Sequence, residues 1–154
     1  LKLTMVLLGA LFVLLGCSSE AKSEFVFEHN MGKQKITYVY DKAKNSVTSL
    51  TFDISYDIAN NKDMETQIRN LRESIVTEIN GIEGVTVTQS DSEKELKVTV
   101  AVDLKKFKYD DEEGRQKAPS LYSSIHTALV KKNDIYSFEE SKKSILDEGF
   151  KEVK

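Results

Sequence analysis

Residues 47–58 constrain the fold more than any other stretch, because apolar and polar side chains alternate along them. The apolar positions are Leu50, Phe52, Ile54, Tyr56 and Ile58. Successive side chains of a strand point to opposite faces, whereas a helix would spread these five around its axis. The stretch therefore predicts a long strand in a sheet with one face in a core and the other in water.

Four further segments have strand character. Segments 25–29 and 36–40 are rich in aromatic and β-branched residues, and residues 30–32 between them form a turn sequence ending in glycine. Segments 85–88 and 96–104 alternate apolar and polar residues. Because short turns join neighbouring segments, we expect an antiparallel sheet of about five strands.

The period changes to that of an amphipathic helix in residues 60–80. The apolar stripe consists of Met64, Ile68, Leu71, Ile75 and Ile79. Asn60 or Asn61 is placed to cap the start of this helix, and Gly81 to end it. Glu65 and Arg69 are spaced for an ion pair between successive turns.

Two more helices are predicted near the C-terminus. Pro119 suits the first turn of one, and residues 137–140 have the capping-box sequence Ser-Phe-Glu-Glu for the other. Gly149 is placed to end the last helix. The predicted order is βββ-α-ββ-α-α, which is an α+β domain with the helices packed on one face of the sheet.

Residues 105–118 are the longest stretch without periodicity, and they contain four consecutive acids at 110–113. These carboxylates repel one another, so we expect a mobile loop. Binding of Ca²⁺ is the alternative, but the alternating ligands and central glycine of an EF-hand loop are missing. A solvated run of charge is the favoured interpretation.

An apolar run over residues 3–17 ends in Leu-Leu-Gly-Cys and is followed by polar residues. About 14 apolar residues are too few to span a bilayer comfortably, but they suit a signal peptide. We therefore expect a lipoprotein signal peptide over 1–16, lipidation of Cys17, a tether over 17–24 and a single domain over 25–154. Cys17 is the only cysteine, so it has no disulfide partner in the chain.

With these residues described, the chain resembles the YehR-like bacterial lipoproteins, a family without a characterised function. The resemblance rests on the lipobox at 14–17, the strand sequence at 36–40, the Gly84-Val85 pair and the ending at 149–154. The acidic residues 110–113 depart from the family pattern. The resemblance implies an envelope lipoprotein with one small α+β domain, carrying palmitate-type acyl chains on Cys17, and it supplies no catalytic residues.

No nucleotide-binding or nucleophile motif is present, and we expect no cofactor and no metal site. His29 and His126, the two histidines, fall in different predicted elements, which is unlike the short spacing of zinc ligands. The formal charge is −3 with both signs interspersed, so nothing indicates nucleic-acid binding. The tyrosines Tyr38, Tyr40, Tyr56 and Tyr122 are expected in the core, with a role in lining a ligand pocket as the alternative.

These features favour a lipoprotein held on the outer face of the cell membrane through Cys17. The predicted function is a non-catalytic binding module for a small ligand or a partner protein. One alternative is an envelope hydrolase that uses carboxylates such as Asp53 or Asp57 with Tyr38. The other alternative is a structural or adhesive surface protein.

Overall fold

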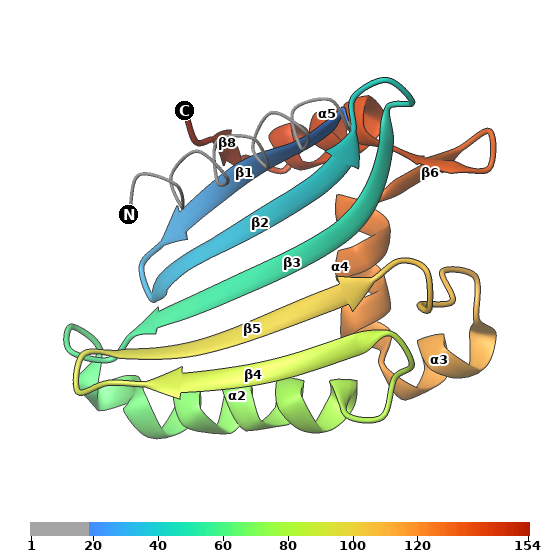
Figure 1. The fold of residues 1–154 in the computed structure, drawn as a ribbon. Coiled ribbons are helices and arrows are strands. Elements are labelled where there is room, and N and C mark those ends of the chain that lie inside the picture. Colours follow the sequence, from blue (N-terminus) through green and yellow to red (C-terminus); the bar gives the residue numbers. More distant parts are fainter. Residues whose placement is uncertain (1–18) are drawn as a thin grey trace, which may run out of the picture.

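The computed structural model describes residues 19–154, which form eight strands and four α-helices around one sheet (Figure 1). The predicted signal peptide and Cys17 lie outside the described residues. The strands are β1 (Glu20–His29), β2 (Gly32–Asp41), β3 (Ser46–Asp57), β4 (Val85–Asp91), β5 (Glu95–Asp103), β6 (Val130–Lys132), β7 (Ile135–Ser137) and β8 (Lys151–Glu152). The helices are α2 (Glu65–Ile79), α3 (Glu112–Lys117), α4 (Pro119–Ala128) and α5 (Phe138–Asp147), with a 3₁₀ turn, η1 (Lys62–Met64), before α2.

Every strand pair in the sheet is antiparallel, and the main order is β4-β5-β3-β2-β1-β8. The β6–β7 hairpin joins the sheet at one point, where Ser46 of β3 pairs with Ser137. The five predicted strands and the α+β class are confirmed, but the sheet is larger than the five strands expected. The three additional strands are two or three residues long, which is too short to show a period in the sequence.

Strand β1 also begins earlier than predicted. Residues 20–24, which we assigned to the tether, pair with β2 in an unbroken register from Glu20↔Asp41 to Glu24↔Thr37. Four of these five residues are polar, which a strand tolerates here because β1 forms the edge of the sheet before β8 pairs with Phe25 and Val26. Pairing with β2 satisfies backbone groups whatever the side chains are. The folded part of the chain therefore starts within three residues of Cys17.

The helices α2, α4 and α5 lie on one face of the sheet, with α2 beneath β4 and with α4 and α5 behind the sheet in the view of Figure 1. The larger of two cores includes Tyr38, Leu50 and Val98 from the sheet, with Ile125 from α4 and Ile145 from α5. A smaller core lies under α2 and consists of Tyr56, Ile58, Ile68 and Leu96. The prediction that the helices pack on one apolar face is thus confirmed.

The mobile loop predicted over 105–118 is wrong in its second half, because residues 112–117 form helix α3. The acids that we expected to repel one another lie at or before its first turn, where carboxylates interact favourably with the helix dipole. Glu113 pairs with Lys117 at 2.9 Å and Asp110 with Lys131 at 3.5 Å. The signal in the sequence was the order of charges, acids followed by Arg115 and Lys117.

Two details of α2 also differ from the prediction. Asn61 makes no capping hydrogen bond; its side-chain amide instead donates to the carbonyl of Asp57 at 2.8 Å. Leu71 of the predicted stripe is 45% exposed, whereas Arg72 is buried. The predicted Glu65–Arg69 ion pair is present at 3.7 Å.

The cap predicted for the last helix is confirmed. The Ser137 hydroxyl accepts a hydrogen bond from the Glu140 amide at 3.2 Å. At the other end of α5, Gly149 has a φ of +101°, and the Phe150 amide donates to the Ile145 carbonyl at 3.1 Å. This geometry turns the chain back so that Phe150 packs on Phe27, with ring centroids 5.5 Å apart.

Candidate ligand-binding groove

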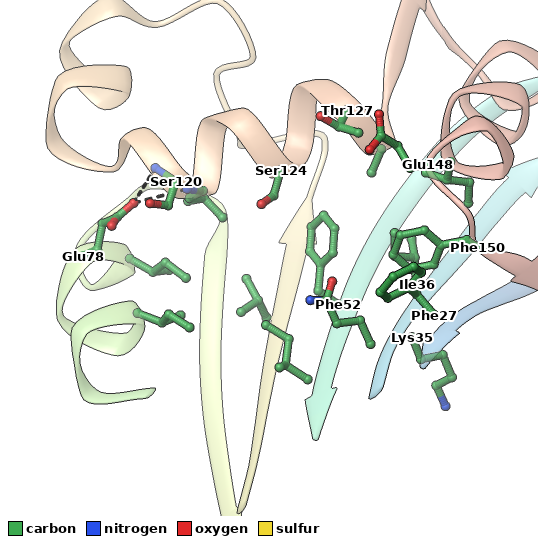
Figure 2. A pocket seen from close by; sticks show the side chains of 18 of the residues that line it. Phe27, Lys35, Ile36, Phe52, Glu78, Ser120, Ser124, Thr127, Glu148 and Phe150 are labelled. Atoms are coloured by element: carbon green, nitrogen blue, oxygen red, sulfur yellow. Dashed lines mark hydrogen bonds between the residues drawn. The ribbon is translucent and has the colours of Figure 1, made fainter. Parts of the chain in front are cut away.

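A groove with a volume of about 420 Å³ lies between the sheet and the three helices on its apolar face (Figure 2). Its floor comes from β1, β2, β3 and β5, and its walls come from α2, α4 and the end of α5. The volume falls in the range of about 300–1,000 Å³ that is usual for small-molecule sites. We call this feature the groove below.

The groove exists because the helices leave a gap over the strands between the two cores. Tyr38 and Leu50, which face each other on β2 and β3, are fully buried. Two residues after Leu50 on β3, Phe52 is only half-buried. Ile54, two residues later, is also half-buried, and its partner on β2 is the exposed Gln34. Apolar floor residues thus lie open between the two cores.

Helix α4 contributes the buried apolar residues Leu121 and Ala128 to the groove, and it also contributes three exposed hydroxyl residues. Ser120, Ser124 and Thr127 follow one another at intervals of four and three residues, so they share one side of the helix. In Figure 2 the Ser124 side chain extends from α4 to the side where the strands lie. The groove therefore offers hydroxyl groups on one side and aromatic and aliphatic carbon on the other.

Two carboxylates lie at opposite ends of the α4 wall (Figure 2). Glu78 of α2 accepts hydrogen bonds from the amides of Ser120 at 2.7 Å and Leu121 at 3.2 Å, so it caps the start of α4. Glu148, just beyond α5, is exposed at the other end. The ammonium of Lys35, which also borders the groove, points away from α4 in Figure 2 and lies 4.0 Å from Asp53.

The residues of the hydrolase hypothesis do not meet. Tyr38 is buried on the helix-covered face, and burial raises the pKa of its hydroxyl. Asp53 lies on the opposite face of the sheet, where it accepts a hydrogen bond from Thr99 at 2.7 Å. Asp57 instead binds Asn60 at the end of β3. A shallow hollow of about 690 Å³ contains both carboxylates, but it also contains Lys35 and Lys97, which pair with acids of the hollow.

The tyrosines lie in or against the cores, as predicted: Tyr38 and Tyr122 in the larger core with Tyr40 packed against it, and Tyr56 in the smaller one. Tyr56 also borders the groove. The two histidines lie in different elements: His29 ends β1, and His126 stacks on Tyr109 with ring centroids 4.1 Å apart. Within residues 19–154 no cluster of three or more His, Cys, Asp or Glu side chains has the geometry to hold a metal ion. No helix in the same residues is long and apolar enough to cross a membrane.

The sequence did not reveal the groove. Phe52 and Ile54 belong to the alternation of β3, so they were expected to be covered. The three hydroxyl residues of α4 lie among ordinary helix residues. The one signal was Gln34, which lies two residues before Ile36 on the same side of β2 and breaks the apolar pattern there.

Comparison with known proteins identifies the fold but not an activity. No protein-family model and no curated protein sequence matches the chain. The NMR structure of the Escherichia coli YehR protein matches 89% of this chain and 93% of its own, with a TM-score of 0.66 and 19% identity. The NMR structure of a protein from Streptococcus pneumoniae TIGR4 matches 87% of this chain and 85% of its own, with a TM-score of 0.55 and 13% identity.

These matches extend over nearly the whole described domain, so the chain has a YehR-like fold. At such low identities the likeness defines the class of structure and nothing about chemistry.

Proposed function

We propose that this protein is a lipid-anchored binding module of the bacterial envelope, and that the groove holds a small amphiphilic ligand without catalysing a reaction. The observation that carries the proposal is the half-buried floor of Phe27, Phe52 and Ile54 beneath the hydroxyl-bearing side of α4. Apolar surface left open in a concave site gains free energy when a ligand covers it, at about 25 cal/mol per Å². The few polar groups of the wall would orient that ligand.

The absence of a convergent acid–base pair in the groove supports binding over catalysis. One oxygen of Glu78 caps α4, and Glu148 lies at the far end of the same helix, so the two carboxylates do not converge (Figure 2). A general acid and base must both reach the reacting atoms within hydrogen-bond distance. The groove provides one carboxylate at each end and hydroxyl groups between them, which suits recognition of a ligand.

The proposed anchor rests on the sequence before the domain. The apolar run and Leu-Leu-Gly-Cys at 14–17 have the pattern of a lipoprotein signal peptide. The carbonyl of Ser19, two residues after Cys17, already accepts a hydrogen bond from the Lys42 amide at 2.8 Å. A lipid on Cys17 would therefore hold the domain directly against the membrane, and two or more acyl chains would make the attachment stable.

The binding proposal is tested with phenylnaphthylamine, a neutral dye that fluoresces in apolar sites. We expect saturable binding to the soluble domain, and we expect Ser124→Trp to weaken it at least tenfold because the indole fills the groove. Ser123→Trp is the matched control, since Ser123 is the neighbouring exposed residue of α4 and does not line the groove. Equal dye binding by both variants, or no binding by the wild type, would refute the proposal.

A further inference from the structure

We infer that the groove selects amphiphiles with a cationic head group over those with an anionic one. This inference rests on the proposed function and adds the sign of the ligand's charge. The structural basis is the placement of Glu78 and Glu148 at the two ends of the α4 wall, with no cation directed into the space between them (Figure 2).

The cations around the groove are engaged elsewhere. Lys35 lies beside Asp53 on the other face of the sheet, at 4.0 Å. Lys117, which shares a surface hollow with Glu78, pairs with Glu113 at 2.9 Å. Lys142 of α5 pairs with Glu152 at 3.1 Å. Neither Glu78 nor Glu148 has an ion-pair partner within residues 19–154, so the local charge of the groove ends is negative.

The carboxylates of Glu78 and Glu148 differ in how many of their oxygens are free to accept a hydrogen bond from a ligand. One oxygen of Glu78 accepts both amide hydrogen bonds of the α4 cap, which leaves its second oxygen for another donor. Glu148 is exposed, and no hydrogen bond or ion pair within residues 19–154 occupies its carboxylate. An ammonium head group at either end would gain a charge-assisted hydrogen bond, whereas a sulfate or carboxylate head group would be repelled.

The part of the groove between Glu78 and Glu148 suits the apolar chain of a ligand. Phe27, Phe150, Phe52 and Ile75 all line the groove and offer it carbon surface. A hydrocarbon chain could lie against these residues and place its head group beside Glu148 or Glu78. The hydroxyl groups of α4 are neutral, so they do not distinguish the sign of the head group.

The test measures how well two detergents of equal chain length, decyltrimethylammonium and decyl sulfate, displace phenylnaphthylamine below their micelle concentrations. We expect the cationic detergent to displace the dye at about five- to tenfold lower concentration, in line with charges near a protein surface. This preference should shrink at high salt, because the Debye length falls to about 3 Å at 1 M.

The variant that tests the assignment is Glu148→Gln, with Asp147→Asn as its control. Both remove one negative charge, but Asp147 is an exposed neighbour that does not line the groove. We expect E148Q to reduce the cation preference at least twofold and D147N to leave it unchanged. Equal displacement by both detergents, an anion preference or equal effects of the two variants would overturn the inference while dye binding still stood. Failure of the dye itself to bind would remove the proposed function as well.

Discussion

The hydroxyl of Tyr38 donates a hydrogen bond to the carbonyl oxygen of Ala128 at 2.5 Å, which fastens the centre of the sheet to the last residue of α4. The two residues are 90 positions apart in the chain. This bond fixes the height of α4 above β2, and with it the height of the groove wall over its floor. The Phe25 and Phe138 rings pack on Tyr38 in edge-to-face geometry, and the bond is buried.

We predict that Tyr38→Phe destabilises the domain by about 1–3 kcal/mol, because a buried carbonyl loses its donor. Urea denaturation of both proteins measures this difference. Tyr40→Phe is the control, since the Tyr40 hydroxyl lies 3.4 Å from the Ser23 hydroxyl at a half-buried site. Its cost should stay below about 0.5 kcal/mol. Equal costs for the two variants would show that the bond to Ala128 is not important.

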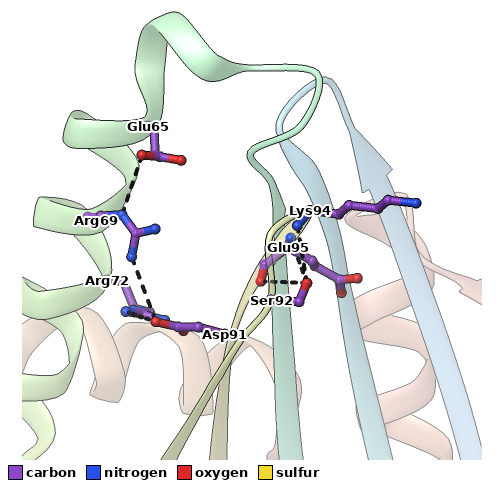
Figure 3. Close-up of polar contacts among 7 residues, drawn as sticks. All are labelled: Glu65, Arg69, Arg72, Asp91, Ser92, Lys94 and Glu95. Carbon is purple, nitrogen blue, oxygen red and sulfur yellow. Dashed lines mark hydrogen bonds and ion pairs between the residues drawn. The ribbon is translucent and has the colours of Figure 1, made fainter.

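Arg72 and Asp91 join α2 to the edge strand β4, and the Arg72 Nη2–Asp91 Oδ2 distance is 3.1 Å (Figure 3). Arg72 is 7% exposed, so Asp91→Asn should leave a poorly compensated buried charge. We expect a loss of about 1–2 kcal/mol. This is less than the roughly 3–5 kcal/mol for a fully buried pair, because water screens the half-exposed Asp91. The double variant R72M/D91N should recover much of the loss, and a failure to recover would contradict this account.

The same pair predicts a pH dependence. Hydrogen bonds from Arg72 lower the pKa of Asp91 below its usual value. A carboxyl group with a lowered pKa in the folded state contributes stability above its unfolded pKa of about 3.9, and this contribution is lost as the pH falls through the folded value. The stability difference between wild type and D91N should therefore be constant from neutral pH down to about 5 and narrow below about 4. Denaturation curves across this range provide the measurement.

Gly32 begins β2 with a φ of +149°, and a Cβ there would lie 1.8 Å from the carbonyl oxygen of Ser55. Gly32→Ala should therefore disrupt the pairing of β2 with β3 and cost more than about 3 kcal/mol. Gly81→Ala is the control, because Gly81 has a φ of +89° but a Cβ added there would meet no atom within 4 Å. It should cost only about 1–2 kcal/mol, for the left-handed backbone. Thermal unfolding distinguishes the two, and a mild G32A variant would contradict the predicted clash.

For the anchor, we predict that Cys17→Ala yields a protein that keeps its leader and carries no lipid. Ser18→Ala, which changes only the next residue, should be processed normally. Mass spectrometry of the protein from bacterial membranes reports both the leader and the acyl mass. Radiolabelled fatty acid that still entered the C17A variant would disprove the assignment of Cys17 as the attachment site.

The long strands and the long helix could be predicted because the spacing of their apolar residues shows the period of a strand or a helix. The alternation runs through the 12 residues of β3 and the 9 residues of β5, and the apolar stripe runs through the 15 residues of α2. Each of these segments is long enough to show its period. The short strands β6, β7 and β8 could not be predicted, since a strand of two or three residues is defined by its partner. Strand β8, for example, exists because it pairs with β1, where the Val153 amide donates to the Glu24 carbonyl at 2.9 Å. This contact depends on where α5 ends.

Periodicity and charge order in the chain alone determined an α+β domain with one covered face, and they also specified the local caps at Ser137 and Gly149. Those features follow from interactions between residues that are neighbours in sequence. The tertiary structure alone decided that Phe52 and Ile54 lie open, that Arg72 is buried in place of Leu71 and that Glu78 and Glu148 lie at the two ends of one helix. Each of these depends on how far one element extends over another, which is set by packing between segments distant in the chain.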